Sequence, residues 1–152
     1  MAKMAQLPKE IKRVWALSAL GSLLVGLIAS GVMALLLPHW IAYVALGLTL
    51  LEVVIELLAV PYRYRFSGYR ISDRAVEISS GWLFKKQLAI PIGRVQNVTL
   101  KAGPLLQLND LQQVVVATAA SSHDIEGLTP EEATRLRDLI MTRALEVKGN
   151  EI

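Results

Sequence analysis

The hydrophobic pattern of the chain is dominated by a continuous apolar stretch, residues 14–60, that contains no Lys or Arg. A single helix of that length would measure roughly 70 Å, more than twice the roughly 30 Å hydrocarbon core of a bilayer. Pro38 interrupts the stretch, because proline lacks a backbone donor and clashes with the preceding turn. The pattern therefore predicts two transmembrane helices, residues 14–37 and 39–60, that pack antiparallel as a hairpin because their connector is so short.

A cleaved signal peptide is the competing interpretation of the first apolar segment. That segment is longer than the roughly 7–15 residues of a usual signal-peptide core, and a second apolar segment follows at once. We therefore favour two permanent membrane spans.

Basic residues flank the predicted hairpin and are missing from its connector. Lys12 and Arg13 precede the first span, and Arg63 follows the second. By the positive-inside tendency, both termini face the cytoplasm, so we expect a multi-pass protein of the cytoplasmic membrane with a basic cytoplasmic N-terminus, residues 1–13. Trp15 and Tyr64 are expected among the lipid headgroups on that side.

After the hairpin, residues 61–148 alternate between apolar and polar positions and then change to helical periodicity. Strands are predicted at residues 69–71, 76–80, 88–90, 95–101, 111–119 and 123–128, of which the valine-rich 111–119 is expected to be well buried. Thr129, followed by Pro130 and Glu132, is typical of a helix start with a capping box, and apolar positions recur from there for about five turns. The pattern predicts a small cytoplasmic α+β domain, an antiparallel sheet with one C-terminal helix, and a tail of residues 149–152.

Composition adds a charge asymmetry to this picture. The chain is 53% hydrophobic with a formal net charge of +3. Residues 61–101 hold eight Lys and Arg against Asp73 and Glu77, whereas residues 102–152 hold four basic and eight acidic side chains. The basic half follows the membrane directly, so attraction to anionic lipid is a better explanation of its charge than nucleic-acid binding, for which no motif is present.

Several short motifs follow one another along nearly the whole chain. They are Leu7-Pro8-Lys9, Tyr69-Arg70-Ile71, Ile90-Pro91, Arg94-Val95-Gln96-Asn97-Val98, Gly103-Pro104-Leu105, Val116-Ala117-Thr118-Ala119 and Ile125-Glu126-Gly127-Leu128. Together with the apolar hairpin, this order resembles the bacterial pleckstrin-homology-like (bacterial PH domain) membrane proteins of the YdbS type. The resemblance implies a partly open, strongly bent antiparallel sheet of about seven strands, closed at one end by a C-terminal helix.

One position departs from that family. Asn109-Asp110-Leu111 stands where family members often show a Gly-Leu pair, so the turn before the valine-rich strand departs from the family's pattern. The biochemical role of the family is poorly defined, so the resemblance implies a fold and a membrane location and does not imply an activity.

Two carboxylates in the second span are the first candidate functional residues. Glu52 and Glu56 lie one helical turn apart, and a charge at the centre of a membrane costs roughly 2.5 to 3.5 kcal/mol. In an antiparallel pair, Ser22 and Ser18 fall at the same depths, so we expect contacts between Ser22 and Glu52 and between Ser18 and Glu56, with Glu52 neutral. A proton or substrate path and a contact to a partner's membrane helix are the alternatives.

Basic residues beside the membrane are the second candidate surface. Three interpretations stay open for it: a solvated face, general attraction to anionic lipid, and a specific headgroup pocket. Its members are Arg63, Arg65, Arg70, Arg74, Lys85, Lys86, Arg94 and Trp82. The resemblance does not extend to a dense basic headgroup loop, because the corresponding turn, Ser72-Asp73-Arg74, carries one acidic and one basic side chain.

The sequence gives little indication of a catalytic site or a metal site. The absence of cysteine excludes disulfides, thiolate metal sites and thiol catalysis, and two distant histidines do not form a metal cluster. Ser122-His123-Asp124 contains the residue types of a hydrolytic triad, but consecutive residues of a strand point to opposite faces. We expect no catalytic residue, cofactor or metal.

These observations favour a non-enzymatic, membrane-anchored interaction module that docks a protein partner or assembles with itself at the cytoplasmic membrane surface. The alternative is a subunit of a transport, export or envelope-stress system that uses Glu52 and Glu56. An enzyme acting on lipids is a further alternative, but it would need a converging polar pocket that the sequence does not indicate.

Overall fold

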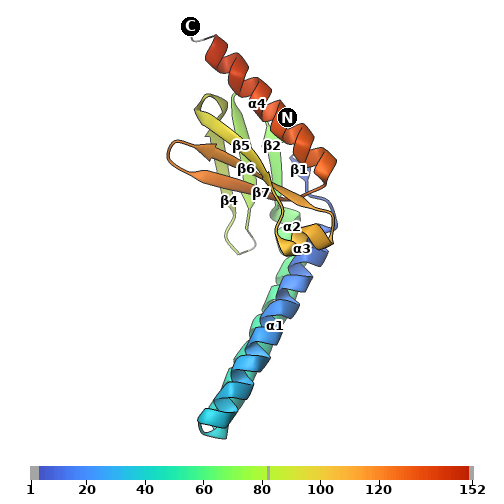
Figure 1. The fold of residues 1–152 in the computed structure, drawn as a ribbon, viewed down its shortest axis with the longest axis vertical. Coiled ribbons are helices and arrows are strands. Elements are labelled where there is room, and N and C mark those ends of the chain that lie inside the picture. The colour runs from blue at the N-terminus through green and yellow to red at the C-terminus, as the bar shows by residue number, and fades with distance from the viewer. Residues whose placement is uncertain (1–3, 82, 151–152) are drawn as a thin grey trace.

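The computed structural model describes residues 4–81 and 83–150 of the 152-residue chain. Figure 1 shows a helical hairpin that projects from a β-rich domain, with the C-terminal helix on the side of the domain opposite the hairpin connector. The hairpin consists of α1 (Ile11–Leu36) and α2 (His39–Phe66), separated at Pro38. Both helices are long and apolar enough to cross a membrane. The break predicted at Pro38 is confirmed.

Helix α2 continues six residues past the expected end of the second span. Pro61 lies inside the helix, which reaches Phe66 and ends where the Ser67 backbone N–H donates to the Arg63 carbonyl at 2.9 Å. Arg63 and Arg65 occupy its last turn, where positive charge is favourable at the negative end of the helix dipole. The membrane helix therefore leads into the domain with only Ser67 between it and the first long strand.

Small residues line the contact between α1 and α2. Ala19 and Ser30 of α1 and Ala42 of α2 are buried, and a Cβ added at Gly26 would lie 2.1 Å from the Thr49 methyl carbon. Such residues let two helices approach closely in lipid. Many other apolar side chains of the hairpin are exposed, as lipid-facing positions are; Leu24 is 62% exposed.

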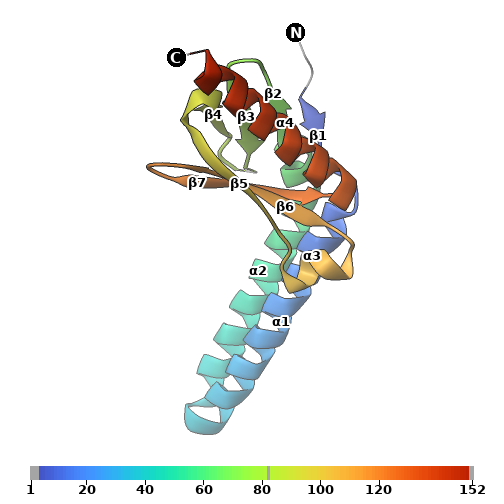
Figure 2. The ribbon, with the colours of Figure 1, turned by 45° about the horizontal axis from the view of Figure 1, so that its top comes forward.

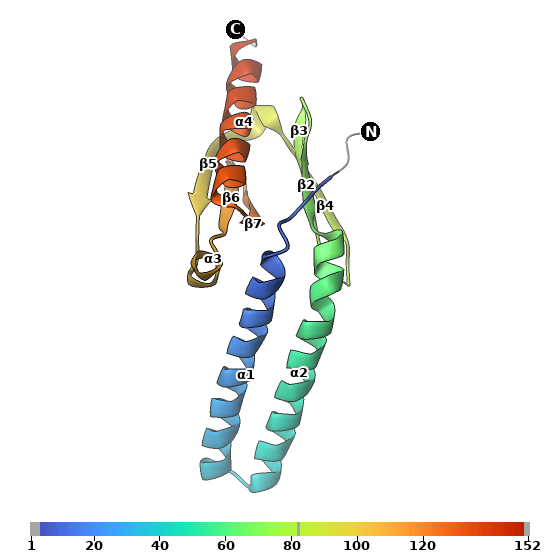
Figure 3. The same cartoon turned by 90° about the vertical axis from the view of Figure 1, so that its right-hand side faces the viewer.

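The domain contains two antiparallel sheets. The first has the order β1 (Ala5–Gln6), β2 (Gly68–Ile71), β3 (Ala75–Ser80) and β4 (Lys86–Pro91), and the second has the order β5 (Val95–Lys101), β6 (Gln112–Thr118) and β7 (Ser122–Leu128). The 3-10 turn η1 (Ile92–Arg94) joins them, and Figures 2 and 3 show the sheets as two facing layers. The seven antiparallel strands confirm the expected PH-like strand number, and they are divided between two sheets where one bent sheet was expected.

The C-terminal helix α4 (Pro130–Gly149) packs against β5, β6 and η1. The predicted capping box is confirmed: the Glu132 N–H donates to the Thr129 hydroxyl and the Thr129 N–H donates to the Glu132 carboxylate, both at 3.3 Å. Leu136 and Ile140 belong to its buried face. The predicted α+β arrangement of sheets and one C-terminal helix is thereby confirmed.

Strand β1 and helix α3 were not predicted, and neither was η1. Strand β1 is formed by the N-terminal segment, which pairs with β2 through Ala5 and Tyr69, and a strand of two residues has no periodicity to detect. The short helix α3 (Pro104–Leu108) follows β5 and has proline at its first turn, where the missing N–H costs nothing. Of these elements, α3 packs against α1.

The beginning of α1 is part of that core. Ile11 is fully buried, and Leu7, Val14 and Trp15 belong to the same cluster as the inward side chains of both sheets. Gly127 of β7 has a φ of 78°, and a Cβ there would lie 2.5 Å from Ile11 Cδ1. The hairpin and the domain therefore share one hydrophobic core, and Trp15 lies in that core and not among lipid headgroups as expected.

Candidate interaction site at the junction of hairpin and domain

At the junction of hairpin and domain, aromatic and basic side chains join the beginning of α1 to the end of α2. The Arg63 guanidinium stacks over Trp15 at 4.4 Å from a ring centroid, and the Lys12 ammonium lies 4.1 Å from the centroid of Tyr64. The Tyr64 hydroxyl donates to the Leu7 carbonyl at 2.9 Å. These contacts tie the end of α2 to the beginning of α1, and they hold the exposed Arg63 where three hollows meet.

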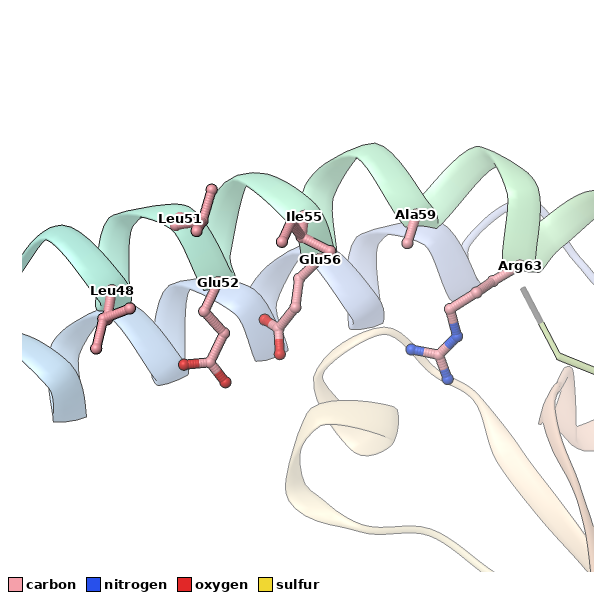
Figure 4. A pocket seen from close by; sticks show the side chains of 7 residues that line it. All are labelled: Leu48, Leu51, Glu52, Ile55, Glu56, Ala59 and Arg63. Atoms are coloured by element: carbon pink, nitrogen blue, oxygen red, sulfur yellow. The ribbon is translucent and has the colours of Figure 1, made fainter. Parts of the chain in front are cut away.

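The first hollow lies along one side of α2. Its volume is about 470 Å³, and its lining includes Leu51, Ile55 and Arg63. Figure 4 shows the carboxylates of Glu52 and Glu56 and the guanidinium of Arg63 on the same side of the helix. Glu52 is exposed and Glu56 is half-buried. The face therefore presents two carboxylates inside the apolar segment and one cation at its end.

The expected serine contacts are not formed in this arrangement. Ser22 donates to the backbone carbonyl of Ser18 at 3.3 Å, and within residues 4–81 and 83–150 no hydrogen bond or ion pair reaches Glu52 or Glu56. The contact face of α2 passes through Val53, and successive helix residues differ by about 100° in direction. Glu52 therefore lies at the flank of the contact face, and Glu56, which is half-buried, lies only about 60° from Val53 at the edge of that face.

The second hollow is a cleft of about 520 Å³ between the two sheets. Trp15 and Arg63 contribute to it from the hairpin, Ser79 and Ser80 from β3, and Asp124, Ile125 and Glu126 from β7. Strand β7 pairs only with β6 in the described part of the chain, so the backbone groups along its other edge are not engaged by a neighbouring strand. Asp124 and Glu126 are exposed along this edge, which gives it a negative charge.

The third hollow, about 340 Å³, lies between α1 and α3. Ser18, Arg63 and Glu126 line it together with Pro104, Leu105 and Leu106. Arg63 thus contributes to all three hollows, and Glu126 contributes to two of them. This arrangement places an acidic strand edge and a basic helix end at neighbouring hollows beside the membrane helices.

The predicted basic surface does not form one patch. Arg65 lies in the last turn of α2, and Lys85 stacks over Phe66 at 4.5 Å, so both lie beside the hairpin, as does Lys86 at the start of β4. Arg70 forms an ion pair with Glu77 across β2 and β3. Trp82 lies outside the described residues.

Two further basic residues lie at the opposite end of the domain. Arg74 follows Asp73 in the turn between β2 and β3, and Asp73 pairs with Arg143 near the end of α4 at 2.9 Å. Arg94 belongs to η1, which packs against α4. The predicted surface is therefore divided between the membrane side and the far side of the domain.

The exposed turn between β6 and β7 holds the former triad candidates. The Ser121 hydroxyl lies 3.0 Å from His123 Nε2, while Ser122, His123 and Asp124 alternate in direction at the start of β7. Across the described ranges, no three His, Asp or Glu side chains gather in a way that would hold a metal ion. The arrangement is a hydrogen-bonded turn.

Comparison with known proteins adds the family. The family model described as "Bacterial PH domain" matches residues 13–144. The chain belongs to this bacterial PH domain family. It is 36% identical over 104 residues to the UPF0699 transmembrane protein YdbS of Bacillus subtilis (strain 168), a match that covers 68% of this chain and 65% of YdbS.

A second relative is the UPF0699 transmembrane protein YdbT of the same strain. The identity is 27% over 94 residues, which covers 59% of this chain and 19% of YdbT. The chain thus spans less than two thirds of the length of either relative. No solved structure matches. The expected family is confirmed, and the two apolar helices agree with the description of both relatives as transmembrane proteins.

The bacterial PH domain carries functional candidates that sequence reasoning missed. Asp124 and Glu126 gave no signal, because acidic residues are ordinary on the exposed side of a strand. The stacking of Arg63 on Trp15 joins residues from two different helices. These side chains come from segments far apart in the sequence, and they line the same hollows only because the tertiary structure packs those segments together.

Proposed function

We propose that this bacterial PH domain protein is a non-enzymatic docking module of the cytoplasmic membrane, with both termini in the cytoplasm. The cleft between the sheets accepts an extended segment of a partner protein. The observation that carries this proposal is the free edge of β7, which lies beside the membrane helices. Membership in the PH domain family supports a binding role in place of catalysis.

A strand edge binds an extended peptide through backbone hydrogen bonds, and alternate side chains provide specificity. Strand β7 offers seven residues, from Ser122 to Leu128. Asp124 and Glu126 lie two positions apart and therefore on the same face of the sheet. The partner segment should carry basic side chains at alternate positions opposite them.

The shared core of hairpin and domain adds a second argument. Because Ile11 and Trp15 are packed with the sheets, the cleft has a fixed position relative to the membrane helices. A partner that is itself at the membrane meets the edge at a high local concentration, which raises apparent affinity without new contacts.

Photo-crosslinking in cells tests this function. A photoreactive residue replaces Ser80 at the rim of the cleft, and a matched probe replaces Thr99, which is exposed on β5. We expect a discrete protein adduct from position 80 that is absent at position 99. The charge reversal Asp124→Lys with Glu126→Lys should abolish the adduct, whereas Glu131→Lys, an exposed change on α4, should preserve it.

The same experiment contradicts the proposal if the adduct survives reversal of both β7 charges or forms equally at position 99. An adduct with a second copy of this chain would specify self-assembly as the docking event. Circular dichroism of each purified variant checks that the domain is folded.

A second candidate function rests on the open face of α2. Glu52 and Glu56 line one hollow with Arg63 and have no hydrogen-bond or ion-pair partner among the described residues, as the working residues of a transport or export subunit would. Glu52→Gln keeps the shape and removes the charge. If the protein is a docking module, Glu52→Gln should give the same crosslinked adduct as the unchanged protein. If Glu52→Gln instead loses a transport activity while its domain stays folded, the transport subunit is favoured.

A further inference from the structure

Two exposed apolar protrusions extend from the domain on its hairpin side. The turn between β3 and β4 exposes Leu83 by 69% and Phe84 by 82%, and α3 exposes Leu108 by 75%. Figure 3 shows α3 and this turn on opposite sides of the two membrane helices. Large exposed apolar side chains of this kind mark a surface that contacts another apolar phase.

The turn between β3 and β4 is held close to the end of the membrane helix. Gly81 has a φ of 121°, and a Cβ there would lie 2.0 Å from the Phe84 carbonyl, so this tight turn requires glycine. The Lys85 ammonium lies 4.5 Å from the ring centroid of Phe66, the last residue of α2. Figure 1 shows the turn extending from β3 and β4 in the direction of the hairpin.

Helix α3, the second protrusion, is held against the membrane helix α1. Leu106 is buried, and its carbonyl accepts from the Leu111 N–H at 2.8 Å. Pro104, Leu105 and Leu106 share a hollow with Ser18 of α1. Because Leu106 points inward, Leu108 projects away from the core.

The depth of these protrusions follows from helix length. A hydrocarbon core of about 30 Å takes about 20 residues of each helix, which places its inner boundary near Leu17 and Leu58 when counted from the connector. Ser18, beside α3, lies at this boundary. Phe66 lies about 12 Å farther along α2, and the β3–β4 turn extends back from there toward the bilayer.

Charge decides which occupant fits the β3–β4 turn. Lys85 and Lys86 are exposed directly beside Leu83 and Phe84. Adjacent apolar and cationic side chains are typical of segments that lie in the interface of an anionic bilayer. We propose that the domain rests on the lipid surface through both protrusions, with Leu83, Phe84 and Leu108 among the headgroups and Lys85 and Lys86 against anionic lipid phosphates.

This contact has a structural consequence. The hairpin alone leaves the domain supported at one place, the junction at Ile11 and Trp15. Two lateral contacts on opposite sides of the hairpin resist tilting of the domain, so the edge of β7 keeps a constant height above the bilayer. The lipid surface thereby becomes part of the support of the domain.

Depth-dependent fluorescence quenching tests the proposal on the full-length protein. The chain has no cysteine, so a single engineered cysteine takes one environment-sensitive label. The test variants are Phe84→Cys and Leu108→Cys. The matched control is Leu145→Cys, since Leu145 is 65% exposed near the far end of α4. Each purified variant is reconstituted in vesicles of phosphatidylglycerol and phosphatidylcholine, where partner proteins are absent.

We expect lipid-attached nitroxide quenchers near the headgroups to quench the labels at positions 84 and 108 at least about twofold more strongly than the label at position 145. Iodide in the aqueous phase should quench the label at position 145 more strongly than the other two, because the lipid surface shields them. A label at either position that behaves like the one at 145 overturns the proposal. If Phe84→Cys fails to fold by circular dichroism, Leu83→Cys, at the same turn, takes its place.

A lipid-charge series tests the role of the lysines separately. Lys85→Gln with Lys86→Gln should increase iodide access to the label at 84 in phosphatidylglycerol vesicles and leave it unchanged in pure phosphatidylcholine. The control pair, Arg94→Gln with Arg137→Gln, removes the same charge from exposed Arg94 on η1 and half-buried Arg137 on α4 and should have no effect. An equal response of both pairs would contradict the assignment of Lys85 and Lys86 to the lipid surface.

Discussion

Gly127 and Ile11 form the contact that joins β7 to the beginning of α1, and replacing both residues tests whether hairpin and domain share a core. Gly127 has a φ of 78°, and a Cβ there would lie 2.5 Å from Ile11 Cδ1 and 2.9 Å from Ile11 Cβ. Gly127→Ala must therefore hold a left-handed backbone and also displace a side chain with no exposed surface.

The two costs of Gly127→Ala can be estimated separately. A left-handed conformation costs an ordinary residue roughly 1–2 kcal/mol, and overpacking a core costs about 1–3 kcal/mol, so we expect about 3 kcal/mol in total. Ile11→Ala removes three carbon groups at about 0.8 kcal/mol each and leaves a cavity, which again gives about 3 kcal/mol. In the double variant most of the overlap disappears, so its cost should be about 1.5 kcal/mol below the sum of the single costs.

Hydrogen exchange of the β6 amides, measured by mass spectrometry in detergent micelles, reports the free energy of opening of the domain. Gly103→Ala is the matched control, because Gly103 has a φ of −75° and nothing lies within 4 Å of an added Cβ. A Gly127→Ala cost equal to that of Gly103→Ala would refute the contact. Strictly additive costs of the two substitutions would refute the shared core.

Three further predictions concern the hairpin, the last helix and pH. Gly26→Ala should lower the midpoint of thermal unfolding in micelles, because its Cβ would overlap Thr49 and overpacking costs about 1–3 kcal/mol. The control Gly21→Ala should leave the midpoint unchanged, because nothing lies within 4 Å of its added Cβ. Equal midpoints in the two variants would refute the helix contact. Thr129→Ala should reduce the hydrogen-exchange protection of the first α4 amides by about 1 kcal/mol, because the capping box is lost. The control Thr142→Ala, at an exposed position of α4, should leave the protection of these amides unchanged. Unchanged protection in both variants would refute the cap. Burial, and then the charge of Glu132, raise the pKa of the Tyr69 phenol above its ordinary 10.0. The folded state therefore favours the neutral phenol, and this contribution to stability is present below pH 10 and is lost as the pH rises through the raised pKa. Denaturant titrations at increasing pH should show a weaker alkaline loss of stability in Tyr69→Phe, and a loss identical to that of the unchanged protein would contradict this assignment.

The candidate site could be predicted only in part. The sequence indicates Glu52 and Glu56 because carboxylates are unusual in an apolar segment, and it indicates Arg63 because it follows that segment. The sequence does not indicate Asp124 and Glu126. Their importance comes from the edge position of β7, which depends on the order of strands in the sheet.

Local features were determined by the sequence alone. The two apolar segments, the break at Pro38, most of the strands and the capping box at Thr129 depend on residues close together in the chain, and each leaves a periodicity or a short motif. The overall order of hairpin, sheets and last helix follows from these features. That order was sufficient to indicate the bacterial PH domain family.

The tertiary structure decided how these elements face one another. Each helix residue turns the direction by about 100°, so the rotation of each helix about its axis decides whether Ser22 and Glu52 meet, and here Ser22 donates to the Ser18 carbonyl instead. In the same way, packing places Ile11 and Trp15 in the core of the domain, pairs Ala5 with Tyr69 and stacks Arg63 on Trp15. These contacts join segments far apart in the chain, and their free energy depends on the complete packing of both sheets against the hairpin.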